Sequence, residues 1–131
     1  MRIGEIMTRD VCTIGLPATV RTATKMMREK DIGSLVVVED DKPVGVITER
    51  DVMVRVTSKK KNPTDITVEE TYSSPLVSIS PDRSVREAAE MMLDKNIRRL
   101  PVVEGGRLVG IITEKDVMRW LLNQLSKHEE Q

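Results

Sequence analysis

The sequence is poor in the side chains that carry much of protein chemistry: among its 131 residues are one cysteine, one histidine, one tryptophan, one tyrosine and no phenylalanine. A single cysteine excludes a disulfide within the chain. No apolar run approaches the roughly 18 residues of a membrane-spanning helix, and no secretory signal follows Met1. We therefore expect a cytoplasmic protein with no membrane anchor.

The scarcity of histidine and cysteine also limits metal binding and covalent catalysis. His128 lies in the polar C-terminal tail, and Cys12 lies in a short β-prone run, where we expect it to pack as a small apolar side chain. A zinc site needs several such ligands together, and a cysteine nucleophile needs a neighbouring base. We expect no metal, no cofactor and no catalytic residue. The enzymatic alternative is a nucleotide hydrolase that uses Asp51 or Asp116 as its base.

A third absence is net charge. The 21 lysines and arginines balance 21 aspartates and glutamates, so no overall basic field attracts nucleic acid. The two aromatic residues, Tyr72 and Trp120, are too few for a surface that stacks bases. Nucleic acid is therefore not an expected partner, and any anion site must be local.

What the sequence does contain is an internal repeat. Val44–Met53 matches Val109–Met118, 65 positions later, in its pattern of apolar, glycine, threonine and acidic residues. The same shift, without a gap, carries Met26–Met27 onto Met91–Met92. A register held over this length indicates one structural unit used twice.

Each copy has about 60 residues, a size at which an isolated core is marginal. Repeat one with its polar linker (57–65) spans residues 1–66, and repeat two spans residues 67–131. We expect the two to pack as one module with pseudo-two-fold symmetry. Ligand sites favour clefts between such halves, so function is expected there.

Each repeat begins with a short strand, which a segment with helical spacing of apolar residues follows. In repeat two, Val85 and Met92 belong to one helical face of about ten residues. Ser84 stands where an N-cap belongs, and Glu87 follows three residues later. Repeat one shows the same pattern with Thr19 as the cap.

Two β-branched runs follow each helix and predict two hairpins. The runs are 35–39 and 44–48 in repeat one, and 100–104 and 108–113 in repeat two. Asp40–Pro43 and Gly105–Gly106 supply the turns. A second helix begins near Glu49 or Glu114, and the later one runs to about Lys127. Each repeat therefore reads β-α-β-β-α.

This layout resembles the cystathionine-β-synthase (CBS) domain family, two copies of which pair into a Bateman module. The motifs that carry the resemblance are Gly-Val-Ile-Thr-Glu-Arg-Asp at 45–51 and Gly-Ile-Ile-Thr-Glu-Lys-Asp at 110–116, each closing a hairpin. The resemblance covers nearly the whole chain. It implies an α+β fold of tandem CBS repeats, binding of adenine nucleotides such as AMP, ADP or ATP, and pairing of the helices into a flat homodimer.

The resemblance also implies two nucleotide clefts, in which the aspartate of each Thr-x-x-Asp binds the ribose hydroxyls and the threonine lies near ribose or phosphate. Cleft one would combine Thr48, Asp51, Leu76, Val77, Arg98, Arg99 and Pro101. Cleft two would combine Thr113, Asp116, Cys12, Thr13, Ile32, Gly33 and Ser34. Because two guanidinium groups can hold phosphate oxygens, we expect cleft one to bind the tighter or more highly charged nucleotide.

The same residues allow a purely structural interpretation. Thr-Glu-Arg-Asp and Thr-Glu-Lys-Asp have the outline of capping boxes, which begin many helices that bind nothing. A carboxylate can nevertheless accept both hydroxyls of a cis-diol, so one motif can serve both purposes.

The sequence thus predicts a regulatory module that senses an adenine nucleotide and acts in trans on an unidentified protein. One alternative is a ligand-free module for structure or protein interaction. The other is a module that binds S-adenosylmethionine, against which the two arginines of cleft one count.

Overall fold

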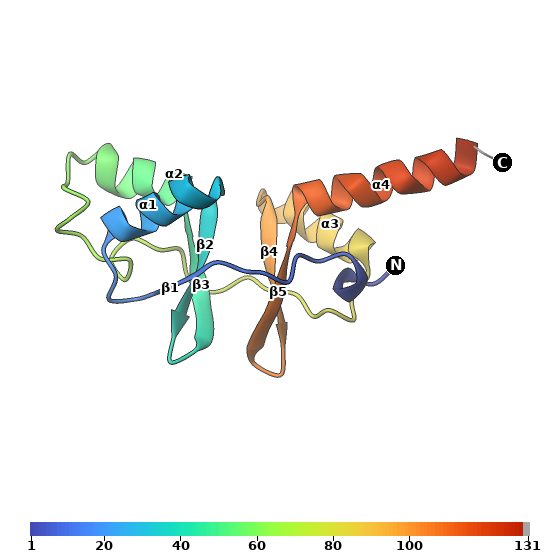
Figure 1. Cartoon of the computed structure of the whole chain (residues 1–131), viewed down its shortest axis with the longest axis horizontal. Coiled ribbons are helices and arrows are strands. Elements are labelled where there is room, and N and C mark those ends of the chain that lie inside the picture. Colours follow the sequence, from blue (N-terminus) through green and yellow to red (C-terminus); the bar gives the residue numbers. More distant parts are fainter. Residues whose placement is uncertain (130–131) are drawn as a thin grey trace. The chain divides into compact units, whose positions relative to one another are not determined.

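The computed structural model describes residues 1–129 and divides into two compact units (Figure 1). The first unit is Val11–Val77, and the second combines Met1–Asp10 with residues 78–129. The predicted boundary after residue 66 separates the sequence repeats, but the folded units differ from the repeats: residues 1–10 belong to the second unit and residues 67–77 to the first. The reason lies in how those segments pair with the hairpins, described below.

The first unit has a three-stranded sheet. Its elements are β1 (Thr13–Gly15), α1 (Val20–Lys30), β2 (Ser34–Glu39), β3 (Lys42–Thr48), α2 (Glu49–Val52) and the π-helical η2 (Met53–Thr57). The strand order is β1-β2-β3, in which β2 pairs parallel with β1 and antiparallel with β3. The predicted β-α-β-β-α order is confirmed for repeat one.

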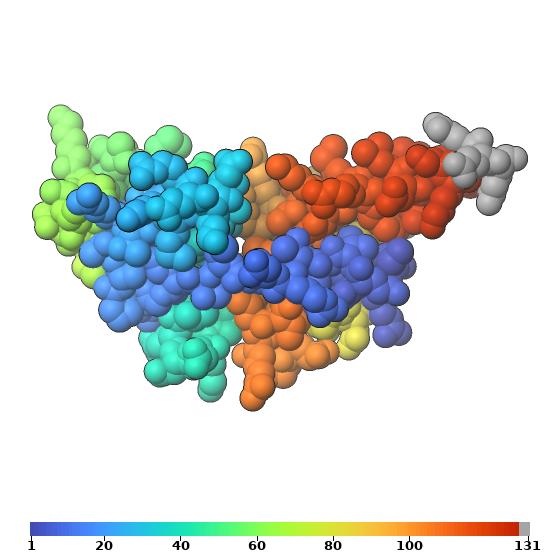
Figure 2. All heavy atoms as spheres, in the orientation of Figure 1, coloured from blue at the N-terminus to red at the C-terminus, as the bar shows by residue number. Residues whose placement is uncertain are grey.

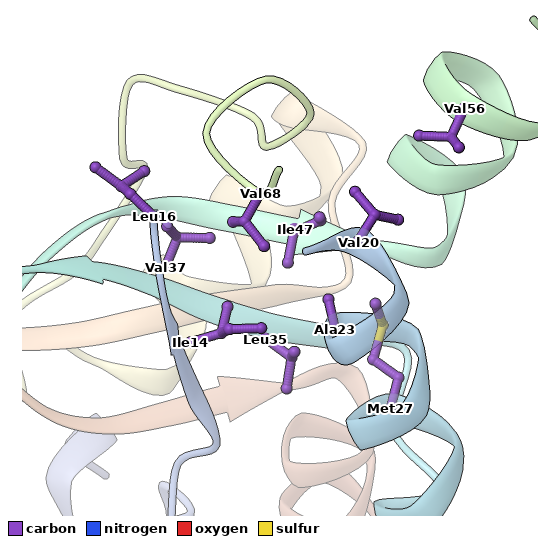
Figure 3. Packing of buried hydrophobic residues seen from close by; sticks show 10 residues of the cluster. All are labelled: Ile14, Leu16, Val20, Ala23, Met27, Leu35, Val37, Ile47, Val56 and Val68. Atoms are coloured by element: carbon purple, nitrogen blue, oxygen red, sulfur yellow. The ribbon is translucent and has the colours of Figure 1, made fainter. Parts of the chain in front are cut away.

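One face of α1 packs with the sheet to form the core of this unit (Figure 3). Val20, Ala23 and Met27 on α1 are buried at the predicted helical spacing. Leu35 on β2 and Ile47 on β3 are also almost fully buried. The remaining members of the cluster are Ile14, Leu16, Val37, Val56 and Val68. Since each buried aliphatic side chain contributes about 1.5–3 kcal/mol, this cluster accounts for the position of α1.

The second unit has a two-stranded sheet. Its elements are η1 (Ile3–Glu5), α3 (Val85–Lys95), β4 (Arg99–Glu104), β5 (Arg107–Thr113) and α4 (Glu114–Glu129). The expected first strand of repeat two is reduced to one parallel bridge, between Ile79 and Val102. Ile79 donates its N–H to the Pro101 carbonyl (3.1 Å) and accepts one from Val103 (2.9 Å). α4 extends past the predicted Lys127.

Both predicted helix caps are present. The Thr19 hydroxyl accepts the backbone N–H of Thr22 at 3.2 Å, and the Ser84 hydroxyl accepts that of Glu87 at 3.1 Å. Each bond satisfies one of the free N–H groups at a helix start, which explains why α1 and α3 begin where they do.

Residues with a left-handed backbone end the helices and form the hairpin turns. Asp31 (φ 53°) follows α1 and Asn96 (φ 54°) follows α3. Gly105–Gly106 forms the second turn, as predicted. The first turn is Asp40–Asp41, two residues shorter than predicted, because β3 already begins at Lys42. Two consecutive residues with positive φ are enough to reverse the direction of the chain between two hairpin strands.

In each unit a segment from elsewhere in the chain lies along the last strand of the hairpin. Ser73 exchanges backbone hydrogen bonds with Val46 at 2.8 and 3.2 Å. Thr8 exchanges them with Ile111, both at 2.8 Å. Ser73 lies 65 positions after Thr8, so the two units repeat this pairing.

Glycine permits these close pairings. A Cβ at Gly45 would lie 2.3 Å from the Ser73 carbonyl oxygen and 2.7 Å from the Tyr72 ring. A Cβ at Gly110 would lie 2.6 Å from the Met7 sulfur. The glycine at the start of each motif, Gly45 and Gly110, is therefore explained by the backbone segment that packs on it.

Candidate functional site

The two Thr-x-x-Asp motifs occupy equivalent positions, at the turn from a hairpin into a helix. In the first unit Thr48 ends β3 and Asp51 lies in α2. The Thr48 N–H donates to Asp51 Oδ2 at 2.9 Å, and the Asp51 N–H donates to Thr48 Oγ1 at 3.1 Å. This reciprocal pair is a capping box, and it holds a carboxylate that is only 8% exposed.

The second oxygen of Asp51 also has a partner within the first unit. Ser73 donates its hydroxyl to Asp51 Oδ1 at 2.7 Å. The segment that carries Ser73 is held in turn by Arg55, whose Nη1 donates to the carbonyls of Thr71 and Tyr72, both at 2.9 Å. Both oxygens of this carboxylate are therefore engaged.

In the second unit the carboxylate of Asp116 is 6% exposed, but its two oxygens are not equally engaged. Oδ2 accepts the Thr113 N–H at 2.9 Å and the Thr113 hydroxyl at 3.1 Å. Oδ1 faces Arg119, whose Nη1 lies at 3.5 Å. That distance is at the limit of a hydrogen bond, and the Arg119 side chain is 73% exposed.

The residues before the middle strand of each repeat lie beside the motif of their own unit. The Gly33 carbonyl accepts the N–H of Glu49, and Ser34 pairs with Thr48. In the second unit the Arg98 carbonyl accepts the N–H of Glu114 at 2.9 Å, and Arg99 pairs with Thr113. Within the second unit, Arg98 and Arg99 thus lie where the hairpin leads into the helix that carries Asp116. The grouping of these two arginines with Asp51 stays a prediction.

The other predicted site residues lie on or near strands. Thr13 lies in β1, and the carbonyl of the free cysteine Cys12 accepts the Val36 N–H at 3.1 Å. Ile32 lies between α1 and β2, its N–H bonded to the Met27 carbonyl. Leu76 and Val77 are half-buried at the end of the first unit. Pro101 is buried in β4.

Each unit has a groove beside its second helix. The groove of the first unit has a volume of about 550 Å³ and is lined by α1, by Ile32–Gly33 and by Glu49, Val52 and Met53; Asp51 is not among its lining residues. The groove of the second unit has about 410 Å³ and is lined by Asp116 and by further polar residues of α4, opposite Met1 and Ile6. Figure 2 shows the N-terminal segment, in dark blue, beside α4 in red.

Sequence reasoning missed Ser73, Arg55 and Arg119. The 65-residue shift places a hydroxyl residue at both 8 and 73, which was a signal for Ser73. Nothing in the spacing indicated that one hydroxyl reaches a carboxylate 22 positions away.

Two further observations concern the part of the chain that the structure describes. Within residues 1–129, no group of three or more histidine, cysteine, aspartate or glutamate side chains is arranged to hold a metal ion. None of the helices in this range combines the length and apolar character that crossing a bilayer requires.

The chain is similar to proteins of several organisms. A Methanopyrus kandleri protein described as uncharacterised is 42% identical over 119 residues, which are 89% of this chain but 61% of that protein. A solved structure from Burkholderia ambifaria, described as a candidate signal-transduction protein with CBS domains, superposes with a TM-score of 0.89 at 29% identity and covers 94% of this chain and 95% of its own.

A hexameric CBS-CP12 protein from bloom-forming cyanobacteria superposes with a TM-score of 0.81 at 35% identity, over 91% of this chain and 71% of that one. The model of the CBS domain matches twice, at residues 3–58 and 68–123, the two copies of the sequence repeat. The chain therefore belongs to the CBS domain family and carries two tandem CBS domains.

Proposed function

We propose that this chain is a regulatory module that binds an adenine nucleotide (AMP, ADP or ATP) and acts in trans on a protein partner. Asp51 and Asp116 are the proposed ribose-binding residues, with Thr48 and Thr113 beside them. CBS pairs are generally regulatory, ligand-binding modules, and the proposal gives this chain its ligand.

The observation that carries the proposal is the pair of buried carboxylates, each fixed by the threonine three residues before it. A carboxylate held in one position can accept two hydroxyls of a cis-diol without first losing side-chain freedom. Each such charge-assisted bond contributes about 1.5–3 kcal/mol, and more where water is excluded.

Arginines near these sites favour a phosphorylated ligand. Arg98 and Arg99 adjoin the strand end that leads into Asp116, and Arg119 lies one turn along α4. Guanidinium groups pair with phosphate oxygens through two parallel bonds. We therefore rank a nucleotide above S-adenosylmethionine, which has no phosphate.

The proposed assembly is a homodimer formed through exposed helices. Met118, Leu121, Leu122 and Leu125 on α4 are 47–61% exposed, and Met53 on the first unit is 60% exposed. Apolar groups gathered on one helix in this way mark an interaction surface. The hexameric cyanobacterial relative supports self-association in the family, and a cytoplasmic location fits the single free cysteine.

Isothermal calorimetry with AMP, ADP, ATP and S-adenosylmethionine tests the proposal. We expect at least one nucleotide to bind, and the double variant Asp51→Asn, Asp116→Asn to weaken it by about 1.5 kcal/mol or more. Glu114→Gln is the matched control, because it removes a charge from the same helix start as Asp116 but from an exposed side chain. If no nucleotide binds at millimolar concentration, the ligand-free interaction module becomes the better description.

A further inference from the structure

The carboxylates of Asp51 and Asp116, the proposed ribose-binding residues, differ in their hydrogen-bond partners. At Asp51, the Ser73 hydroxyl donates to Oδ1 at 2.7 Å, a short charge-assisted bond, and Thr48 holds Oδ2. At Asp116, Thr113 donates both its N–H (2.9 Å) and its hydroxyl (3.1 Å) to Oδ2, and Oδ1 has Arg119 at 3.5 Å. A hydroxyl donor is what a ribose would offer, so Ser73 already stands in for one at Asp51.

The position equivalent to Ser73 in the second unit is Thr8. Its backbone pairs with Ile111, as Ser73 pairs with Val46, but its side chain is exposed. The backbone pairing is therefore present in both units. Among the described residues, the paired segment also bonds to the motif aspartate through its side chain in the first unit, where Ser73 donates to Asp51.

Arg55 and Trp120 form a second pair of equivalent positions, and here too the residue of the first unit makes the hydrogen bonds. Arg55 fastens the carbonyls of Thr71 and Tyr72 and so holds Ser73 in place. Its equivalent 65 positions later is Trp120, whose Nε1 is buried without a hydrogen-bond partner within the described chain. In the first unit, Arg55 thus holds the segment that bonds to Asp51. A tryptophan side chain has one N–H donor and cannot make the same pair of bonds in the second unit.

The groove of the second unit adjoins the available carboxylate. Asp116, Arg119, Trp120, Asn123 and Lys127 lie at helical spacing along one face of α4, and all line this groove of about 410 Å³. Two cations and one carboxylate give this face the charge complement of a ribose phosphate: a hydroxyl acceptor at one end and phosphate partners further along. The indole ring and Ile6 add apolar surface.

We propose that Asp116 and its groove form the nucleotide site of higher affinity in this chain, and that Ser73 is an internal competitor that weakens binding at Asp51. This inference rests on the proposed function. It reverses the order expected from the sequence, in which Arg98 and Arg99 made cleft one the tighter site. A ligand at Asp51 must displace a formed bond, whereas a ligand at Asp116 meets an acceptor whose present partner is long and exposed.

The test uses two measurements on the full chain with ATP and AMP as probes. Calorimetry records every binding event, and fluorescence of Trp120, the single tryptophan, records occupation of the groove that it lines. The variants are Asp116→Asn, Asp51→Asn and Ser73→Ala. Thr8→Ala is the matched control because it truncates the equivalent side chain, and Ser73→Thr keeps the hydroxyl.

We expect wild type to show one tight event that changes tryptophan emission. Asp116→Asn should weaken that event by about tenfold or more, the equivalent of one charge-assisted hydrogen bond, while Asp51→Asn leaves it unchanged. Ser73→Ala should tighten or reveal a second event, silent in fluorescence, by about tenfold. Thr8→Ala and Ser73→Thr should behave as wild type.

The outcomes separate this inference from the proposed function. Nucleotide binding that is silent in fluorescence, weakened by Asp51→Asn and unaffected by Asp116→Asn, would overturn the inference and leave the proposed function standing. Absence of any nucleotide binding would refute both. A Ser73→Ala protein that folds and binds as wild type would refute the competitor role; if this variant does not fold, the two aspartate variants decide the order of the sites.

Discussion

Replacement of Gly45 by alanine should be among the most destabilising single-methyl additions that this chain can receive. The added Cβ would lie 2.3 Å from the Ser73 carbonyl oxygen and 2.7 Å from two carbons of the Tyr72 ring. The nearest of these atoms belongs to the backbone, so a side-chain rotation cannot relieve the overlap. The segment around Ser73 must therefore move away from β3.

The cost follows from the contacts that this movement breaks. Overpacking by one methyl group typically costs about 1–3 kcal/mol. Loss of the two backbone hydrogen bonds between Val46 and Ser73 adds about 0.5–1.5 kcal/mol each. We expect Gly45→Ala to lower the free energy of unfolding by about 2–6 kcal/mol.

Two other glycines provide graded controls. At Gly15 a Cβ would meet only Pro17 Cδ, at 3.6 Å, which is an ordinary contact, so Gly15→Ala should be neutral or slightly stabilising. At Gly110 the nearest atom is the sulfur of Met7, a flexible side chain, with the Thr8 carbonyl oxygen at 2.9 Å. Gly110→Ala should therefore fall between the other two.

Urea unfolding followed by far-ultraviolet circular dichroism measures the three variants and wild type. The expected order of stability is Gly15→Ala, then Gly110→Ala, then Gly45→Ala. If Gly45→Ala is within about 0.5 kcal/mol of Gly15→Ala, a difference typical of neutral surface substitutions, close approach of the Ser73 segment is not the reason for this glycine.

Two smaller predictions concern the helix ends. Ser84→Ala removes the acceptor for the Glu87 N–H and should cost about 1 kcal/mol of unfolding free energy, whereas Ser84→Asp should retain most of it; equal losses in the two variants would exclude a capping role. Asp31 has a left-handed backbone (φ 53°) after α1, so Asp31→Gly should raise the free energy of unfolding by about 0.5–1 kcal/mol and, with it, the thermal unfolding midpoint. Asp94→Gly, within α3, should lower the midpoint. A loss of stability in Asp31→Gly would contradict this account.

Features set by neighbouring residues could be predicted from the sequence. The Thr19 and Ser84 caps, the Gly105–Gly106 turn and the buried stripe of α1 each depend on residues within a few positions of one another. The capping-box interpretation of Thr48 and Asp51 was correct for the same reason.

Features that depend on distant segments could not be predicted. The bond from Ser73 to Asp51 joins residues 22 positions apart, and the spacing of either motif carries no trace of it. The first strand expected in repeat two is a single parallel bridge, between Ile79 and Val102 of β4. The repeat pattern also does not extend to Arg55 and Trp120, which occupy equivalent positions: Arg55 donates to the Thr71 carbonyl, whereas Trp120 Nε1 has no hydrogen-bond partner within the described chain.

The pairing around Gly45 and Gly110 means that neither sequence repeat, cut after residue 66, contains the segment that pairs with its own hairpin. Each hairpin is completed by residues that lead into the first strand of the other repeat: Tyr72–Ser73 for one, Met7–Thr8 for the other. A gene cut between the repeats would leave each product with the wrong covering segment attached. Two identical single-repeat chains could, however, supply this segment to each other, because the Ser73–Val46 and Thr8–Ile111 pairings are equivalent in the two repeats.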